Sequence, residues 1–473
     1  MLTRHITKIS LVCTLSSFTA LGSAQCILEG FTDEEAIEST LFGSSVDIQG
    51  DRMVVGAMLD TGADWASGAV HLFERQDDSW ELIKIILAPD GDLTDMLGNS
   101  VAIDGDRIIA GAWWDEDTGT RSGAAYIFER DEETDWHMAA KLVASDGLPE
   151  ATFGRTVAIQ GDFAVVGAPL HSGDGSAAGS AYLYERDSMG EWSQRGKIVP
   201  SDLAIADRFG LAMDMDGTTV VIGSPWSDAE RGKVYLFEIG AGGSWSETAI
   251  LQPAGIDPGD QFGFDVALDG ETLAVGAYKD DGVVEDSGSL WFYESSSLGW
   301  ELSQGPLRAP ELSSDGGAQF GVSVALEDDM ALIGARYASI DSVTGCGTVV
   351  LANRTSAGWS LGEQLVSESP QTEGEFGWQV ALDGSYGVVS ALYEDAGVAD
   401  DGRAYVLGLD AVTCGGVIGD LNGDGVVSGP DLTILLANWG PCVDVSDCPA
   451  DLDGNGTVNG ADLTLLLSNW VSL

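Results

Sequence analysis

The chain has 473 residues, with 76 acidic against 21 basic side chains and a formal net charge of -55 at pH 7. A field of this sign repels phosphate backbones and anionic lipid, so nucleic acid and bare membrane surfaces are excluded as expected partners, while cations are favoured. With 44% hydrophobic residues, 63 glycines and only 13 prolines, the chain is expected to be globular and rich in turns rather than disordered.

The N-terminus has the pattern of an export signal. Arg4 and Lys8 precede an apolar stretch at 9–21, and the small residues at 22–24 suit a cleavage site. We therefore expect residues 1–24 to be a signal peptide and the mature protein to be secreted or held at the cell surface. No other stretch approaches the ~20 apolar residues of a membrane span, so no direct membrane insertion is expected.

Cysteine usage fits an exported protein, in which disulfides are permitted. Loss of the signal peptide leaves five cysteines: Cys26, Cys346, Cys414, Cys442 and Cys448. Cys442 and Cys448 lie close enough in sequence to form a bridge, and Cys26 and Cys414 flank the large domain and could join its ends. Other pairings stay open, and with these two bridges Cys346 would be a free thiol.

Residues 25–412 repeat one pattern seven times. The pair Phe-Gly, once Leu-Gly, recurs about every 56 residues, and it begins at Phe42, Leu97, Phe153, Phe209, Phe262, Phe320 and Phe376. In the third copy an alternating run reaches the turn at 160–162, a β-branched run ends in Gly167-Ala168, and a last strand begins at Trp192. Four short strands joined by turn residues form an antiparallel meander, so seven copies predict an all-β, seven-bladed β-propeller.

These repeats resemble FG-GAP repeats, the blades of integrin-type propellers, and in particular the secreted bacterial subtype. The second half of the motif is a pair of small residues: Gly56-Ala57, Gly111-Ala112, Gly167-Ala168, Gly223-Ser224, Gly276-Ala277, Gly334-Ala335 and, most divergent, Ser390-Ala391. Small residues here would let an inner strand approach the crowded propeller axis. The resemblance implies a binding or adhesion role.

The seventh copy lacks the outer strand that a tryptophan begins in the other copies. The N-terminal segment 26–30, just before the first Phe-Gly, is expected to supply that strand and so leave no open sheet edge. A bridge between Cys26 and Cys414 would lock the closure. Integrin-type blades that bind calcium have an Asp-rich loop after the first strand, whereas the connection here is a minimal hairpin such as Asp104–Asp106, so no calcium is expected in the propeller.

One face of the propeller is a candidate ligand surface. We call it the Phe-Gly face, because the loops that precede Phe-Gly and those that follow Gly-Ala are expected to emerge there. Its aromatic residues are Trp113, Trp114, Trp226, Tyr278, Tyr337 and Tyr393. Rings beside carboxylates could stack on sugars, which makes carbohydrate a candidate ligand, or the rings could simply pack between blades.

No catalytic residues are predicted. Several carboxylates lie near the aromatic positions, namely Glu116, Asp280, Asp281, Glu394 and Asp395. Among 76 acidic residues the sequence cannot select a pair at the separation that glycoside cleavage needs, and solvated acidic loops are the simpler interpretation. No nucleophile elbow, phosphate loop or zinc signature is present.

The C-terminal segment 413–473 contains two copies of one acidic loop. Positions 1, 3, 5, 7, 9 and 12 are Asp420, Asn422, Asp424, Val426, Ser428 and Asp431 in the first loop, and Asp451, Asp453, Asn455, Thr457, Asn459 and Asp462 in the second. Alternate oxygens, including the backbone carbonyl of position 7, would surround one hard cation, and Gly425 and Gly456 permit the sharp bend at position 6. The two loops predict two Ca²⁺ sites, and Ca²⁺ is expected to fold the segment.

Each loop leads into a short apolar run that predicts a helix. The pair resembles a type I dockerin over about Gly419 to Trp470, because Asp at position 12 and a single helix after each loop match dockerins better than EF-hands. The resemblance implies calcium-dependent docking to a cohesin-like or other cell-surface protein. Glycine, proline and alanine stand at positions 10 and 11, where cellulosomal dockerins commonly carry hydroxyl residues, so the partner is expected to differ from a standard cellulosomal cohesin.

Two functions are consistent with this organisation. The favoured one is an exported calcium-binding propeller protein that acts as a binding, adhesion or assembly module, because no catalytic constellation can be named. The alternative is a carbohydrate-active enzyme, an O-glycosyl hydrolase or another polysaccharide-degrading activity, recruited through its dockerin. A third possibility is that the tail docks on a second copy of the same propeller.

Overall fold

The computed structural model describes the chain except for residues 1–6, 11–25, 33–38, 77–78, 132–134, 174–175, 283, 310–311, 313–316, 341, 368, 396–398, 410–420, 422–426, 428, 443–447, 449, 453–455 and 469–473. The chain forms two compact units, one centred on 31–405 and one that contains the C-terminal helices. Among the described residues, no helix is long and apolar enough to cross a membrane.

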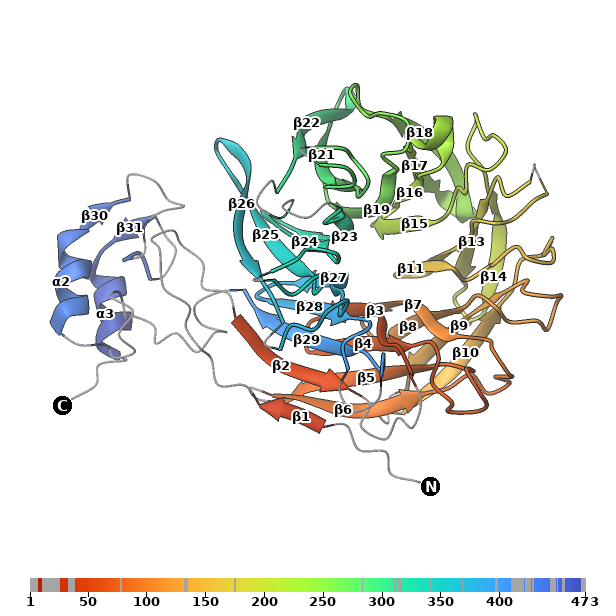
Figure 1. Ribbon diagram of the computed structural model, residues 1–473, viewed down its shortest axis with the longest axis horizontal. Coiled ribbons are helices and arrows are strands. Elements are labelled where there is room, and N and C mark those ends of the chain that lie inside the picture. Colours follow the sequence, from red (N-terminus) through yellow and green to blue (C-terminus); the bar gives the residue numbers. More distant parts are fainter. Residues whose placement is uncertain are drawn as a thin grey trace. The chain divides into compact units, whose positions relative to one another are not determined.

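Seven antiparallel sheets form the predicted β-propeller (Figure 1). The first three blades are β3 (Phe42–Gln49), β4 (Arg52–Ala57), β5 (Ala69–Gln76) and β6 (Ser79–Ile86); β7 (Leu97–Asp104), β8 (Arg107–Ala112), β9 (Ala124–Arg130) and β10 (Trp136–Leu142); and β11 (Thr156–Gln160), β12 (Phe163–Ala168), β13 (Ser180–Arg186) and β14 (Trp192–Ile198). The fourth is β15 (Ala212–Asp216), β16 (Thr219–Ser224), β17 (Lys233–Gly240) and β18 (Ser244–Leu251), with the short turns α1 (Ser227–Glu230) and η1 (Ala241–Gly243).

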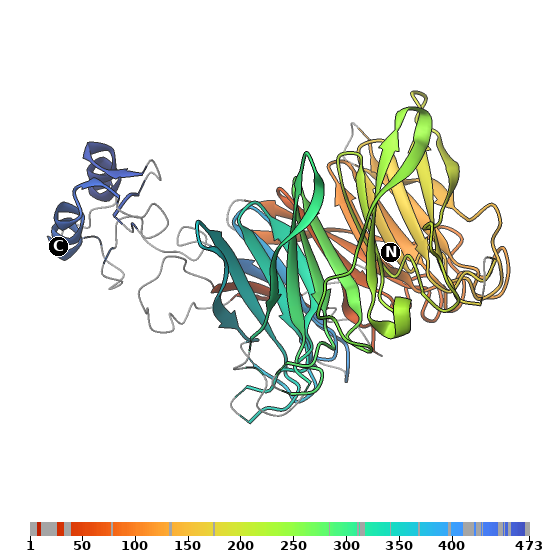
Figure 2. The same cartoon turned by 90° about the horizontal axis from the view of Figure 1, so that it is seen from above.

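The remaining blades follow the same order. They are β19 (Phe262–Asp269), β20 (Thr272–Ala277), β21 (Ser289–Ser296) and β22 (Gly299–Leu307); β23 (Phe320–Glu327), β24 (Met330–Ala335), β25 (Thr348–Thr355) and β26 (Gly358–Leu365); and β27 (Phe376–Asp383), β28 (Tyr386–Ala391) and β29 (Arg403–Gly408). The first strand of each blade faces the middle of the ring and the fourth lies at the rim (Figure 1), while the strands run between the two faces that carry the loops (Figure 2).

The hydrophobic core lies between neighbouring blades. One cluster joins Val54 and Leu72 of the first blade to Ile108 and Tyr126 of the second, and equivalent clusters join later pairs. The phenylalanine of the Phe-Gly motif is buried, and outside the sixth blade it meets aromatic rings of the third strand; Phe209, for example, meets Tyr235 edge-on with the ring centroids 5.5 Å apart. The repeated motif therefore marks one packing position in every blade.

The glycine of the Gly-Ala pair permits contact with the next blade. A Cβ added to Gly56 would lie 1.9 Å from the carbonyl oxygen of Gly98, and one added to Gly276 would lie 2.0 Å from that of Gly321. The small residue thus serves contact with the following Phe-Gly turn, whereas the approach to the axis expected from the sequence stays a prediction. At the last junction Ser390 takes this position, and its hydroxyl accepts a hydrogen bond from Gln379 N at 3.1 Å.

The ring closes as predicted with an N-terminal strand. The seventh sheet has the order β1-β2-β29-β28-β27, so β2 (Cys26–Thr32) supplies the missing outer strand. The fifth strand, β1 (Thr7–Ser10), lies within the predicted signal peptide, and cleavage after Ala24 would leave four strands as in the other blades. Cys26 is disulfide-bonded, but its predicted partner Cys414 lies outside the described residues. Cys346 is a free, buried thiol, as predicted.

The C-terminal unit contains two short helices, α2 (Gly429–Ala437) and α3 (Gly460–Ser468). Two strands, β30 (Gly440–Pro441) and β31 (Thr457–Val458), pair antiparallel and connect the two halves. The hydrophobic core of this unit consists of Val427, Leu435, Ala450, Val458 and Leu466. Val427 and Leu435 of the first sequence copy are equivalent to Val458 and Leu466 of the second, and Ala450 lies between the copies. The predicted helix after each loop is confirmed.

Candidate functional site

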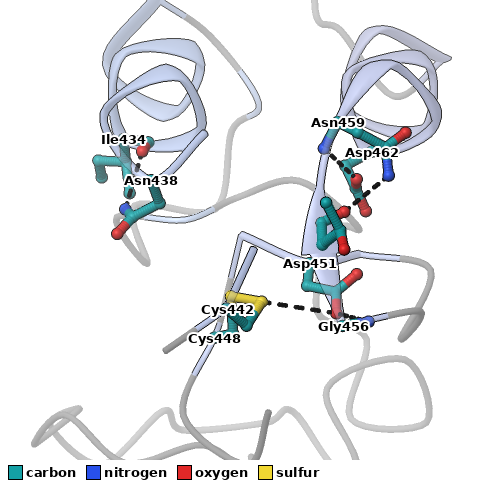
Figure 3. Close-up of a disulfide and its surroundings, with 9 residues drawn as sticks. Ile434, Asn438, Cys442, Cys448, Asp451, Gly456, Asn459 and Asp462 are labelled. Carbon is teal, nitrogen blue, oxygen red and sulfur yellow. Dashed lines mark hydrogen bonds between the residues drawn. A yellow bond between two sulfur atoms is a disulfide. The ribbon is translucent and has the colours of Figure 1, made fainter. Parts of the chain in front are cut away.

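The second acidic loop is partly described, and its side chains turn toward one another (Figure 3). Asp462 is fully buried in the first turn of α3, and its Oδ2 accepts a hydrogen bond from Asn459 N at 2.7 Å. The Asn459 side chain donates from Nδ2 to the Thr457 carbonyl at 2.7 Å and accepts from Ala461 N at 2.9 Å. Asp451 Oδ2 accepts from Gly456 N at 2.6 Å, which bends the loop back at position 6. These contacts bring together four of the predicted ligand positions.

The first loop repeats the part of this arrangement that is described. Asp431 is fully buried at the start of α2, and its Oδ1 accepts a hydrogen bond from Leu421 N at 2.9 Å. The other predicted ligands of both loops lie outside the described residues: Asp420, Asn422, Asp424, Val426, Ser428, Asp453 and Asn455. Within the described part of the chain, no three histidine, cysteine, aspartate or glutamate side chains form a group that could hold a metal ion.

The charge balance of this segment is one-sided. Residues 413–473 contain eight aspartates and no lysine, arginine or histidine. Asp431 and Asp462 are nevertheless fully buried, and a buried carboxylate is costly unless a counter-charge or a metal compensates it. The atoms available as metal ligands are carboxylate, amide and carbonyl oxygens, which are the ligands that Ca²⁺ takes in proteins. The residues present therefore fit a hard cation.

A disulfide joins Cys442 to Cys448 between the two loops, as predicted (Figure 3). Backbone hydrogen bonds tie both cysteines to the second loop: Cys442 N donates to the Gly456 carbonyl at 3.1 Å, and Asp451 N donates to the Cys448 carbonyl at 2.8 Å. The bridge thus fixes the first and sixth positions of the second loop relative to β30.

Both helices expose apolar side chains at equivalent positions. Leu436 of α2 is 52% exposed and Leu467 of α3 is 48% exposed, and Trp439, just after α2, is 49% exposed. Leu435 and Leu466, one residue earlier, are fully buried in the core. Each helix therefore has one leucine that packs inside and one that faces solvent, in the same register.

The aromatic residues predicted for the Phe-Gly face are found at the strand ends that form it. Phe262 pairs with Ala277 and Phe320 with Ala335, so first strands begin where second strands end. Tyr278 is buried against Phe264, with the ring centroids 4.1 Å apart. This ring therefore packs inside the fold and does not form part of an exposed ligand surface. Tyr337 is 38% exposed, and Trp113, Trp114, Trp226 and Tyr393 are half-buried.

Arginines cover several of these rings, which the sequence analysis missed. Arg155 lies 5.2 Å from the Trp113 ring centroid, Arg208 lies 4.1 Å from that of Trp226, and Arg121 lies 4.2 Å from that of Trp114. Arg336 lies 4.9 Å from the Tyr337 ring and 4.7 Å from the Trp378 ring. Arg155 and Trp378 both stand two residues after the phenylalanine of their repeats, and comparison of that position across the copies could have revealed them.

Two of the carboxylates near the rings have structural partners. Asp280 forms an ion pair with Arg308 and accepts a hydrogen bond from Ser289 Oγ at 2.6 Å. Glu394 accepts from Tyr405 at 2.7 Å and forms an ion pair with Arg403, and burial raises the pKa of Glu394. Glu116, Asp281 and Asp395 are exposed. Within the described residues these five carboxylates therefore divide between blade-stabilising contacts and solvated loops.

The first strands enclose an axial tunnel of about 360 Å³. Its hairpin turns are joined from blade to blade, because Asp104 Oδ2 accepts from Gly161 N at 2.7 Å and Asp216 Oδ2 accepts from Gly270 N at 2.8 Å. Farther inside, burial raises the pKa of Asp47 to about 7 and that of Asp214 to about 6, although backbone N–H groups hydrogen-bond both side chains. The hairpin acids thus act as connections between blades.

Comparison with protein families gives two matches. The FG-GAP repeat matches residues 31–73, 80–128, 136–184, 192–237, 245–293 and 359–407, together more than half of the chain, and the dockerin type I domain matches 418–469. The stretch 294–358 is outside the matched repeats, although it contains β23, β24 and β25, the first three strands of the sixth blade. No curated protein matches the chain significantly.

Proposed function

Because this chain belongs to the FG-GAP repeat family and ends in a type I dockerin domain, we propose that it is an exported, calcium-binding assembly module. The dockerin docks to a cohesin-like or other cell-surface protein, and the propeller displays a ligand-binding face. The observation that carries the proposal is the burial of Asp431 and Asp462 in a segment that contains no basic residue.

Ca²⁺ supplies the positive charge that this segment lacks. Asp420, Asn422, Asp424, Val426, Ser428 and Asp431 would hold one ion, and Asp451, Asp453, Asn455, Thr457, Asn459 and Asp462 the other. Bound Ca²⁺ would neutralise carboxylates that otherwise repel one another, so that ion binding and folding of the segment are coupled. The existing hydrogen bonds of Asp451, Asn459 and Asp462 support this role, because they already orient the second loop.

The partner should present an apolar surface. Leu436 and Leu467 are the exposed leucines of α2 and α3, and Trp439 adds a large ring beside the first. Burying such side chains is worth about 1.5–3 kcal/mol each, enough to make a few of them decisive for docking. Because the two leucines are equivalent by the internal repeat, either helix could dock in the same way.

Calorimetric titration of the full chain, stripped of divalent ions and then supplied with CaCl₂, tests the ion sites. We expect two sites tighter than roughly 10 μM. Asp431→Ala and Asp462→Ala should each remove one site, while Asp395→Ala, in an exposed propeller loop, should remove none. Failure to bind Ca²⁺, or loss of both sites in the Asp395→Ala variant, would contradict the proposal.

Docking is tested by capture of the full chain on immobilised type I cohesin domains and on surface-protein extracts of the source cells. Capture should require Ca²⁺ and should fall at least about tenfold in a Leu436→Asp/Leu467→Asp variant, because charges would replace both apolar contacts. The matched control is Ser468→Asp, which adds a charge at the end of α3 and leaves both leucines in place. Capture that survives chelation would argue against a dockerin role.

A further inference from the structure

Three arginines of the propeller differ from the others in their partners. Acidic residues greatly outnumber basic ones, and typical described arginines are ion-paired, such as Arg121 with Glu150 and Arg354 with Asp329. Among the described residues, no carboxylate forms an ion pair with Arg155, Arg208 or Arg336. In a chain this acidic, three guanidinium groups on one face without acidic partners call for a physical reason.

All three belong to the Phe-Gly face. Arg155 directly precedes β11, Arg208 directly precedes the Phe209-Gly210 pair, and Arg336 directly follows β24. First strands begin on the same edge where second strands end, as the pairing of Phe320 with Ala335 shows, so the three side chains start from one face of blades three, four and six. The opposite face holds the hairpin turns that are already joined by hydrogen bonds.

Aromatic rings hold these guanidinium groups in place. Arg208 lies 4.1 Å from the centroid of Trp226 and Arg155 lies 5.2 Å from that of Trp113, and no hydrogen bond from either guanidinium to a described residue is present. Arg336 stacks near Tyr337 and Trp378, and its one hydrogen bond to another described residue runs from Nε to Gln319 Oε1 at 2.7 Å. A guanidinium stacked on a ring keeps its N–H donors available in a fixed fork that matches a carboxylate or sulfate.

The exposed carboxylates Glu116, Asp281 and Asp395 lie near the same rings and repel anions in general, so recognition of an anion must come from the three guanidinium groups themselves. Burial raises the pKa of Glu375, a carboxyl group whose charge interacts with Arg336, so its own negative charge is disfavoured. Trp113 Nε1 is a buried donor for which the described residues supply no hydrogen-bond partner. The face therefore combines three half-buried guanidinium groups, an unsatisfied indole N–H and partly exposed aromatic rings.

We propose that the Phe-Gly face binds a polyanionic polysaccharide through Arg155, Arg208 and Arg336. The carboxylate or sulfate groups of the sugar accept hydrogen bonds from the guanidinium groups, and sugar C–H faces pack on Tyr337 and the half-buried tryptophans. Guanidinium groups on blades three, four and six require a ligand that repeats its anionic group, which a polysaccharide does. This inference rests on the binding role proposed for the propeller and names the ligand class.

The test measures binding of the full chain, with Ca²⁺ present, to polygalacturonate and to dextran sulfate by biolayer interferometry at constant ionic strength. Neutral dextran and poly-glutamate serve as comparison probes. We expect binding to at least one of the two anionic polysaccharides, with the responding probe distinguishing uronate from sulfate. Dextran lacks the anionic groups and should bind at least about tenfold more weakly, since one hydrogen bond to a charged group is worth roughly that factor. Poly-glutamate offers carboxylates but no sugar C–H faces for the aromatic rings, and it should also bind at least about tenfold more weakly.

Substitutions then locate the site. Arg208→Gln should weaken binding by about tenfold, and Arg155→Gln/Arg208→Gln/Arg336→Gln should abolish it. Arg354→Gln is the matched control, because it removes an arginine that stacks on Trp359 and lies outside the Phe-Gly face; it should change the Kd by less than about twofold. If the triple variant is unfolded by circular dichroism, the single Arg208→Gln variant decides.

Absence of binding to both anionic polysaccharides, undiminished binding by folded variants, or equal binding of poly-glutamate would overturn the proposal, the last in favour of an acidic peptide ligand. Calcium titration of the same samples reports the C-terminal loops independently. Two bound Ca²⁺ without polysaccharide binding would therefore overturn this inference alone, whereas polysaccharide binding without Ca²⁺ binding would support it and contradict the docking proposal.

Discussion

Replacing Gly276 by alanine should destabilise the propeller strongly. The new Cβ would lie 2.0 Å from the carbonyl oxygen of Gly321 in the next blade, whereas ordinary contacts begin about 1.4 Å farther out. The Gly276 backbone is outside the left-handed region, so alanine causes no strain of its own there. The fifth and sixth blades must separate, and in a closed ring that displacement is passed to their neighbours. We expect a loss near the upper end of overpacking costs, about 3 kcal/mol.

Equilibrium urea unfolding, followed by tryptophan fluorescence, measures this loss. The matched control is Ser390→Ala at the equivalent position of the seventh blade, where a Cβ is already accommodated. That variant loses only the hydrogen bond from Gln379 N, worth about 1 kcal/mol. If Gly276→Ala costs no more than Ser390→Ala, the small residue of the Gly-Ala pair is not needed for blade contact and the reasoning fails.

Three further predictions follow from the same contacts. Burial raises the pKa of Asp47 to about 7, so the folded state binds this proton more tightly than the unfolded state does, and the free energy of unfolding should fall as pH rises from 5 to 8.5. Asp47→Ala introduces the residue that the second blade carries at the equivalent position, Ala102. The variant should lose about 1–4 kcal/mol of that fall, as measured by urea unfolding at each pH. An unchanged slope would contradict this. Glu394→Gln should cost about 3 kcal/mol in thermal unfolding, because Arg403 loses its buried partner, and a loss below that of the exposed Asp395→Asn would refute it. Cys442→Ser/Cys448→Ser should weaken Ca²⁺ binding by the second loop and cost about 2 kcal/mol in the C-terminal unit, and an equal effect on Asp462→Ala protein would count against it.

The repeats made the propeller predictable, because each Phe-Gly pair marks one packing position and the missing outer strand of the last copy could only come from the N-terminus. The hairpin acids were predicted only as turn residues. Asp104 bonds a glycine 57 residues away, in the next blade, and that partner is apparent only when the ring is closed. The arginines of the Phe-Gly face were missed for a similar reason. Arg208 precedes β15 and Trp226 follows β16, and only the antiparallel pairing of these two strands brings the two side chains together.

The C-terminal loops were predicted from spacing alone, because an alternation of oxygen ligands is local in sequence. Asp431 and Asp462 are found at the helix starts, as the twelve-residue spacing requires. The exposure of Leu436 and Leu467 could not be predicted, because each stands beside a leucine that is buried, and only the packing of the two helices distinguishes them.

The pairing of β2 with β29 has a consequence for how the chain matures. The Thr32 hydroxyl donates a hydrogen bond to the Gly402 carbonyl, 370 residues away in sequence. The strand β2 is therefore synthesised early but can pair only after the last blade has been made. Until then the first blade lacks its neighbour on one side, and a product that ends before β29 cannot complete the ring. Ring closure therefore comes late in synthesis, because β2 has no partner strand until β29 has been made.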